Sequence, residues 1–373
     1  KDGSDTTTGF IEIVRLSNTN VANFTLENLS PQVSTSGSPV PGVLIDRSSE
    51  TDPQTIEGGL GKDTLIGGRA GDLINSSGSA DHLEGNQGND TFDGGLGNDT
   101  IEGDEGNDTI KDYYGTNSIL AGDGADEIHI AGESAFIDAG SDASNDRIYY
   151  SDLTGTTTIV AGLGDDRIER RHISELTERV HENLIVYLDE EDGETNNDGN
   201  DVYISSDPHL STKIYGRGGN DNITTNAVNI FADGGIGNDT ITGYQTSSYS
   251  RYEKFGDPSE FEWRASLKGG EGEDTLGFSY YSNIHYDWDH DFVLDGGPGH
   301  DIIHSEGGWN PGNGWTRNPG IRALGGDGND TFRINGFVKD IVLSGGSGSD
   351  LFVLHENHYL NKLEWPSRHG VES

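Results

Sequence analysis

The sequence predicts an all-β fold, a right-handed parallel β-roll or β-helix solenoid, on three observations. Six aspartates that close glycine-rich turns are spaced nine residues apart without a slip: Asp63, Asp72, Asp81, Asp90, Asp99 and Asp108. The same turn pattern returns later, in hexapeptides that end in Asp239, Asp274, Asp301, Asp330 and Asp350. Each closing Asp except Asp81, which His82 follows, precedes a Thr, Leu or Ile at the start of a strand. A fixed period of this kind is typical of repeat architectures, in which two nonapeptides make one coil.

The composition fits a thin, acidic, cation-binding solenoid. Lys and Arg total 23 against 65 Asp and Glu, a net charge of −42. Nucleic acid is excluded as a partner, because no basic stripe is present to neutralise phosphates. The absence of Cys excludes disulfides and thiolate metal sites. No apolar run approaches transmembrane length, so membrane insertion is not expected. A hydrophobic content of 31% is low for a globular core but sufficient for one apolar stripe per coil.

Residues 1–56 carry no repeat and form a separate N-terminal segment. Residues 10–16 and 21–29 are predicted to be strands, and a Ser/Pro/Gly-rich loop follows them. Two roles are open for this segment. It caps the end of the solenoid, as every such stack requires, or it donates a strand to a neighbouring subunit.

The remaining chain divides by the regularity of the repeat. Residues 57–126 keep the strict period and form a regular β-roll, whereas 127–355 form an irregular one. There the closing aspartates are mostly about 20 residues apart, which predicts that only one corner of each coil keeps the glycine-rich turn. Loop insertions are expected at 169–198, 243–266, 277–293 and 304–320, and residues 356–373 form a C-terminal tail. Within the first insertion, Ile173, Leu176, Val180 and Leu184 follow helical spacing.

The turns resemble the RTX nonapeptide repeats of type I-secreted bacterial proteins, which read G-G-x-G-x-D-x-U-x. The pattern is complete at 58–63, 94–99, 234–239, 269–274, 296–301, 325–330 and 345–350. The resemblance implies a calcium-loaded β-roll that is secreted and extracellular at the bacterial cell surface, with multiple Ca²⁺ ions shared between stacked turns. The residues expected to bind Ca²⁺ through closing carboxylates or turn carbonyls are Gly58, Leu60, Asp63, Asp72, Asp81, Gly85, Asp90, Gly94, Leu96, Asp99, Gly103, Asp108, Asp126, Asp146, Asp166, Asp201, Asp221, Gly234, Asp239, Gly269, Asp274, Gly296, Asp301, Gly325, Asp330, Gly345 and Asp350.

Elementary electrostatics supports calcium independently of the resemblance. Stacked strands lie about 4.8 Å apart, so a metal-free Asp ladder places like charges near that spacing. At an effective dielectric of about 20 each neighbouring pair repels by roughly 3 kcal/mol. We therefore expect a loose or unfolded metal-free chain that folds on binding Ca²⁺. The ladder is interrupted at Asn117 and Ala135, and Ser76 and Ser77 replace the glycines before Asp81.

No complete catalytic motif is present. His181 and Glu182 begin a string that puts Ile185 where a zinc protease needs its second His, and no G-x-S-x-G elbow occurs. Asp207-Pro208-His209 resembles part of the DPHE motif of mannuronan epimerases, with Leu210 in place of Glu; a Pro-containing turn between strands is the simpler interpretation. We therefore expect no enzyme.

All five Trp residues fall late in the chain, at Trp263, Trp288, Trp309, Trp315 and Trp365, near Tyr280, Tyr281, Tyr286, Phe292 and the acidic, His-containing run 285–291. This cluster packs the insertions, forms a subunit interface or binds a sugar or metal.

The favoured function is that of an extracellular calcium-binding structural or adhesive protein that self-assembles into a surface layer, filament or matrix. The alternative is a carbohydrate-binding or polysaccharide-modifying protein of the lyase or epimerase kind. The expected partner is a second copy of the chain or a cell-surface glycan.

Overall fold

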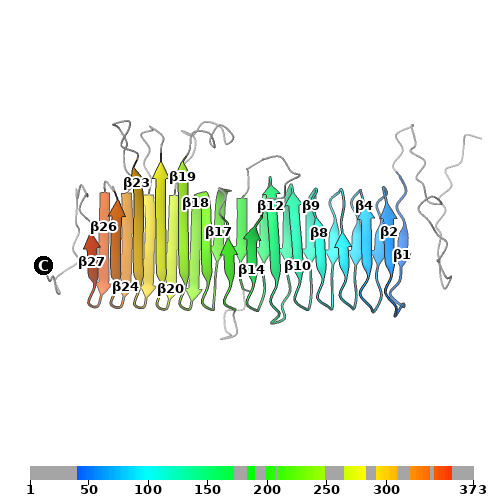
Figure 1. Cartoon of the computed structure of the whole chain (residues 1–373), viewed down its shortest axis with the longest axis horizontal. Helices are drawn as coiled ribbons and strands as arrows, with labels where there is room; N and C mark the ends of the chain where they lie inside the picture. Colours follow the sequence, from blue (N-terminus) through cyan, green and yellow to red (C-terminus); the bar gives the residue numbers. More distant parts are fainter. Residues whose placement is uncertain are drawn as a thin grey trace, which may run out of the picture.

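The chain forms a long parallel β-solenoid (Figure 1). The computed structural model describes residues 40–171, 183–189, 199–205, 209–247, 264–282, 291–309, 320–336 and 340–354. All 27 strands of these residues pair in parallel, and each strand pairs with the strand one coil earlier or later. No helix occurs among the described residues. The predicted all-β solenoid is therefore confirmed.

Two sheets form the walls of the solenoid. Sheet A contains β1 (Leu44–Asp46), β3 (Thr64–Ile66), β5 (His82–Glu84), β7 (Thr100–Glu102), β9 (Thr116–Leu120), β11 (Ser134–Asp138), β13 (Thr156–Val160), β15 (Asn183–Tyr187), β17 (His209–Tyr215), β20 (Arg264–Glu271), β22 (Asp291–Pro298), β24 (Gly320–Asp327) and β26 (Asp340–Ser347). Sheet B contains β2 (Thr55–Gly59), β4 (Leu73–Ser77), β6 (Thr91–Asp93), β8 (Thr109–Asp112), β10 (Glu127–Gly132), β12 (Arg147–Leu153), β14 (Arg167–Arg170), β16 (Val202–Ile204), β19 (Thr240–Ser247), β21 (Thr275–Ser282), β23 (Ile302–Trp309), β25 (Thr331–Gly336) and β27 (Leu351–Leu354). The long strand β18 (Asn222–Ile236) belongs to both sheets.

The core consists of two stacks of apolar side chains, one from each sheet. Side chains alternate between the two faces of a strand, so every coil sends its middle residue inward. Sheet A contributes a stack that includes Leu65, Leu83, Ile101, Ile119 and Ile137, and sheet B contributes Ile56, Ile74, Phe92, Ile110 and Ile128. In-register parallel pairing continues both stacks to the last coils. One residue per strand is thus enough to build a continuous core, as the low hydrophobic content implies.

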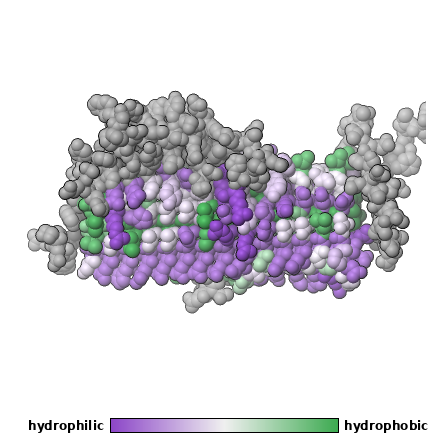
Figure 2. Space-filling view, viewed as in Figure 1, coloured by the Kyte–Doolittle hydropathy of each residue, from purple (hydrophilic) through white to green (hydrophobic). Residues whose placement is uncertain are grey.

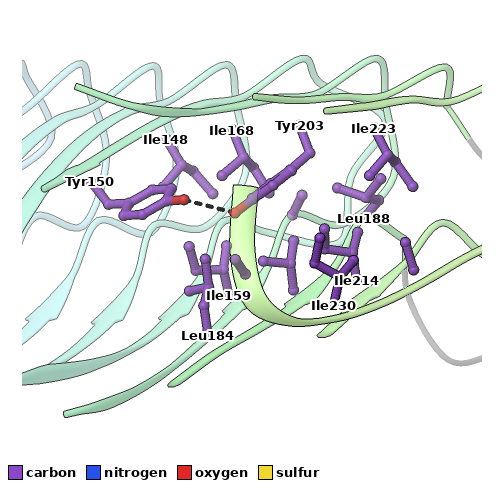
Figure 3. Close-up of a cluster of buried hydrophobic side chains, with 14 of the residues drawn as sticks. Ile148, Tyr150, Ile159, Ile168, Leu184, Leu188, Tyr203, Ile214, Ile223 and Ile230 are labelled. Atoms are coloured by element: carbon purple, nitrogen blue, oxygen red, sulfur yellow. Dashed lines mark hydrogen bonds between the residues drawn. The ribbon is translucent and has the colours of Figure 1, made fainter. Parts of the chain in front are cut away.

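The core also holds two tyrosines from coils far apart in sequence. The hydroxyl oxygens of Tyr150 and Tyr203 lie 2.8 Å apart and form a buried hydrogen bond (Figure 3). Leu184 and Phe292 are buried in the same core, 1% exposed each, and the Phe292 ring packs 4.4 Å from that of Phe278. The helical pattern predicted through Leu184 is therefore wrong at that residue, which lies in β15. Phe292 is a core residue and does not belong to an exposed aromatic cluster.

Strands occupy part of every range in which the sequence indicated an insertion. β15 lies inside 169–198, and the ends of β19 and β20, β21 and β22, and β23 and β24 lie inside the other three. The reason is that parallel pairing extends β19 to β24 to eight residues each and β15 to five, beyond the three-residue strands of the regular repeat. Residues 40–56 likewise contain β1 and the start of β2, so they belong to the first coil. The strands predicted at 10–16 and 21–29 lie outside the described residues.

Candidate calcium-binding columns

The closing aspartates stack into two columns at the two corners of the solenoid. The long column precedes the strands of sheet B and contains Asp72, Asp90, Asp108, Asp126, Asp146, Asp166, Asp201, Asp221, Asp239, Asp274, Asp301, Asp330 and Asp350. The short column precedes the strands of sheet A and contains Asp63, Asp81 and Asp99. The long column runs along the edge of regular tight turns in Figure 1, and this edge is mostly hydrophilic in Figure 2.

Each carboxylate links its coil to the preceding one. Within the long column the Oδ1 atom of each Asp after Asp72 accepts a hydrogen bond from the backbone N–H of the Asp one coil earlier, and Asp72 Oδ1 accepts from Gln54 N. The N–O distance is 2.7 Å from Asp90 N to Asp108 Oδ1 and 3.1 Å from Asp330 N to Asp350 Oδ1. The same bond joins Asp63 N to Asp81 Oδ1 at 2.7 Å in the short column. The ladder therefore tolerates coils of 18 to 35 residues, because only the turns must align.

The second oxygen of most of these carboxylates has no hydrogen-bond partner, although it is buried. This holds for Oδ2 of Asp63, Asp81, Asp90, Asp99, Asp108, Asp126, Asp166, Asp201, Asp221, Asp239, Asp274, Asp301 and Asp330. Leaving a buried polar group unsatisfied costs about 1–3 kcal/mol, and more for a charged group. A repeated row of such oxygens therefore indicates a bound cation.

Glycine at the first position of the turn keeps open the space that the Oδ2 atoms face. Asp72 Oδ2, the first in the long column, differs from the others because it also accepts a hydrogen bond from Gly68 N at 2.6 Å. A Cβ on Gly67 would lie 2.7 Å from Asp72 Oδ2 and 2.6 Å from the carbonyl oxygen of Gly85, the first residue of the next turn in the stack. The same pair, the closing carboxylate and the next first-position carbonyl, surrounds the position of a Cβ on eight further glycines: Gly58, Gly85, Gly103, Gly216, Gly234, Gly269, Gly296 and Gly325. We call each of these spaces a cradle. Any side chain would fill it.

Burial raises the pKa of the ladder carboxyls in the metal-free chain. Desolvation is the largest cause, and for most of these carboxyls the charges of neighbouring ladder aspartates add to it. The pKa rises to about 6 for Asp63, Asp99 and Asp274, to about 7 for Asp90, Asp108, Asp126, Asp146, Asp239 and Asp301, and to about 9 for Asp166, Asp201 and Asp221. A cation in the cradles would reverse this cost, because it favours the ionised carboxylates.

The donor set fits Ca²⁺. Carboxylate and carbonyl oxygens are the ligands that this hard cation prefers. Within the described part of the chain, no three His, Asp or Glu side chains come together as a metal-binding group. A metal held in the cradles must therefore take backbone carbonyl oxygens in addition to the Asp Oδ2 atoms. When bound, Ca²⁺ supplies charge neutralisation along each column.

The structure brings most of the predicted ligand residues together, with differences among them. All the predicted aspartates lie in one of the two columns. The predicted glycines lie at the cradles, with two exceptions: the space at Gly94 faces two carboxylates, and the space at Gly345 faces only the side chain of Asp350. Leu60 and Leu96 have exposed side chains, and the carbonyl of Leu96 accepts a hydrogen bond from Ser79 N at 2.6 Å. This carbonyl is thus already used between turns.

The short column ends where the sequence departs from the repeat. The position of Asp99 is occupied in successive coils by Asn117, Ala135 and Thr157, whose hydroxyl accepts a hydrogen bond from Ala135 N at 3.2 Å. Leu184 follows in register, so this corner joins the apolar core. At Asp81 the cradle is not open, because Ser76 occupies its first position and donates a hydrogen bond to the Gly94 carbonyl.

Two buried carboxylates beside the columns were missed by the sequence analysis. Asp112 occupies a first-position glycine site, and its pKa is raised to about 8, mainly by burial and then by the charge of Asp99. Asp189 is fully buried, accepts a hydrogen bond from Gly199 N at 3.3 Å, and its charge raises the pKa of Asp166. An Asp in place of a turn glycine was the available signal for Asp112.

The partial catalytic motifs fall largely outside the described residues. Of the partial DPHE motif, Asp207 and Pro208 lie outside them, as do His181 and Glu182 of the protease-like string. Among the Trp residues only Trp309 lies in a described strand, at the end of β23.

Comparison with family models identifies the repeat. The model of the RTX calcium-binding nonapeptide repeat matches residues 55–74, 75–110, 231–245 and 293–310. Comparison with curated proteins and with solved structures gave no match. None of the described residues forms a helix long and apolar enough to cross a membrane.

Proposed function

This chain carries the RTX calcium-binding nonapeptide repeat, and its repeats bind Ca²⁺ at multiple sites. From that premise we propose an extracellular structural or adhesive protein of the bacterial cell surface. It folds on binding Ca²⁺ and then self-assembles. RTX repeat proteins are typically secreted by type I systems, which supports the extracellular location. Calcium is scarce inside cells and abundant outside them, so folding would follow export.

An exposed apolar stripe carries the assembly part of the proposal. The third positions of the short-column turns are Leu60, Gly78, Leu96 and Tyr114. The side chains of Leu60, Leu96 and Tyr114 are 52, 56 and 44% exposed. A Cβ on Gly78 would lie 3.6 Å from the Leu96 Cβ and 3.9 Å from Leu60 Cδ2, so the two leucine side chains lie on either side of Gly78. An apolar stripe on a chain of net charge −42 favours contact with another protein surface.

The ends of the solenoid provide a second support. Within the described residues, β1 and β2 pair only with the coil after them, and β26 and β27 only with the coil before them. Unpaired parallel strand edges are templates for pairing with another chain. A head-to-tail contact between such ends does not close on itself and therefore builds filaments.

The test is the mass of the calcium-loaded protein by multi-angle light scattering. We expect the native chain to grow beyond a monomer in millimolar Ca²⁺, and the triple variant L60S/L96S/Y114S to remain smaller with an unchanged far-UV circular dichroism spectrum. Leu73→Ser, which removes an apolar side chain of 46% exposure outside the stripe, is the matched control. A native chain that stays monomeric, or a triple variant that assembles equally well, would contradict self-assembly.

A glycan-binding role is the second candidate, and one groove favours it. A polar groove of about 780 Å³ beside the long column is lined by Arg69, Glu84, Asn86, Gln87, Asp104 and Glu105, among others. These side chains offer hydrogen-bond donors and acceptors of the kind that hydroxyl groups match. Calorimetric titration with acidic and neutral polysaccharides tests this candidate, and heat that disappears in Asn86→Ala would support it.

A further inference from the structure

The repeat at residues 112–117 exchanges two residue types relative to its neighbours. It reads DYYGTN, with Asp112 where most turns have their first glycine and Asn117 where they have the closing Asp. The preceding turn of the same column, 94–99, reads GGLGND. The repeat thus lacks the closing carboxylate but carries a carboxylate five residues earlier.

The side chain of Asp112 faces the Gly94 cradle. It is 1% exposed, its Oδ1 accepts a hydrogen bond from Tyr114 N at 3.4 Å, and its Oδ2 has no hydrogen-bond partner. A Cβ on Gly94 would lie 2.5 Å from Asp112 Oδ2 and 3.3 Å from Asp99 Oδ2, which also has no partner. Two unsatisfied, buried carboxylate oxygens therefore converge on one small space.

This arrangement modifies the cradle found elsewhere in a specific way. At Gly67 the space lies between Asp72 Oδ2 and the carbonyl oxygen of Gly85, the first residue of the next turn. Asp112 is the first residue of the turn after Gly94. Its carboxylate oxygen, instead of its carbonyl, is the nearest atom to the space. The Gly94 cradle thus has two carboxylates where the others have one carboxylate and one carbonyl.

Asn117 retains the hydrogen bond that a closing Asp accepts from the preceding coil. Its Oδ1 accepts the hydrogen bond from Asp99 N at 3.0 Å, as an aspartate would, and its Nδ2 donates to the Tyr114 carbonyl at 3.2 Å. Being neutral, it contributes no charge to a cation. Asn117 therefore keeps only the coil-joining task of a ladder Asp, and the carboxylate of its repeat, Asp112, lies in the cradle of the preceding turn.

We propose that Asp99 and Asp112 together hold a Ca²⁺ ion in the Gly94 cradle, with the Asp112 carboxylate in the place that a backbone carbonyl takes in the other cradles. The short column then ends with an occupied site at its last closing Asp, Asp99. This site depends on the calcium binding of the repeats and not on self-assembly.

The first test is to count bound calcium by native mass spectrometry on the full chain. We expect Asp112→Asn to bind one ion fewer than the native chain, because it removes the charge with little change in shape. The control Asp93→Asn removes an exposed carboxylate one residue before Gly94 and should leave the count unchanged. An unchanged count in Asp112→Asn would overturn the proposal.

A second variant keeps the proposal testable if Asp112→Asn fails to fold. Asp99→Asn removes the other carboxylate of this cradle and keeps an acceptor for Asp81 N, as Asn117 does for Asp99 N. It should likewise bind one ion fewer, and an unchanged count would overturn the proposal. The double variant D99N/D112N should also lose one ion, because the two carboxylates share it. A loss of two ions would overturn the proposal.

Discussion

The side chains of Asn89 and Asp90, adjacent in the chain, accept hydrogen bonds from opposite neighbouring coils. Asp90 Oδ1 accepts from Asp72 N, one coil earlier, at 2.6 Å, and Asn89 Oδ1 accepts from Asn107 N, one coil later, at 3.0 Å. The same opposed pair recurs at Asn220 and Asp221, and at Asn238 and Asp239. Each turn is thus fixed from both sides by two successive side chains. The Asn ladder is exposed and the Asp ladder is buried, so only the Asp ladder suits a cation.

This division predicts different results for substitutions at Asn238 and Asp239. Asp239→Asn keeps an acceptor for Asp221 N, as Asn117 does for Asp99 N, but it removes the charge and the ligand Oδ2. We expect one calcium ion fewer and a higher calcium concentration at the midpoint of folding. Asn238→Ala removes only the acceptor for Glu273 N and should lower the free energy of unfolding by about 1 kcal/mol.

Calcium counting by native mass spectrometry and calcium-dependent circular dichroism separate the two variants. An equal calcium count in Asp239→Asn and the native chain would show that Oδ2 of this residue is not a ligand. A lower count in Asn238→Ala would show that the exposed ladder also contributes to metal binding.

The neighbouring residues Gly58 and Gly59 provide a test of the cradle. A Cβ on Gly58 would overlap Asp63 Oδ2 and lie 3.1 Å from the Ser76 carbonyl oxygen, whereas a Cβ on Gly59 would meet no atom within 4 Å. Gly58→Ala should therefore lose the calcium ion associated with Asp63. Gly59→Ala should keep this ion, and the calcium concentration at its folding midpoint should equal that of the native chain. Isothermal titration calorimetry gives both counts, and equal binding by the two variants would contradict the cradle.

The fold and the long column could be predicted because they depend on a local period. A closing Asp and a first-position Gly within six residues specify each turn, and parallel stacking then follows. The end of the short column at Asn117 and Ala135 was likewise visible as a break in the period. In both cases the information lies within one repeat.

The remaining features depend on contacts between coils, which a single repeat does not encode. Asp112 differs from a surface carboxylate only because Gly94, in the previous coil, leaves room for it. Phe292 lies in an aromatic stretch of the sequence, yet it packs on Phe278 in the core. Leu184 fits a helical spacing, but its register with Thr157 and Thr212 places it in sheet A.

The backbone of Ser79 is strained. Its φ is 100°, in the left-handed region that favours glycine, and the equivalent residues Gly97 and Gly61 are glycines. A non-glycine residue in such a conformation costs of order 1–3 kcal/mol. Ser79→Gly should therefore raise the free energy of unfolding of the calcium-loaded chain by about 1 kcal/mol, after the larger backbone entropy of glycine is subtracted. Ala80→Gly, which relieves no left-handed φ, is the control and should lower it by roughly 0.5–1 kcal/mol. Chemical denaturation measures both, and a destabilised Ser79→Gly would contradict the strain.

The raised carboxyl pKa values predict opposite pH dependences with and without calcium. Burial raises the pKa to about 7 at Asp90 and about 9 at Asp166, against about 3.9 in an unfolded chain. Between these values the metal-free folded state binds more protons than the unfolded state, so its stability is greatest below about pH 4 and is lost as the pH rises through 7 to 9. Metal-free protein should therefore gain strand signal in circular dichroism when acidified from pH 8 to pH 4.

The calcium-dependent folding should respond to pH in the opposite way. Because Ca²⁺ binds the ionised carboxylates, acidification through pH 7 should raise the calcium concentration needed for folding. Metal-free protein whose strand signal stays the same or falls on acidification would show that the buried ladder does not control folding.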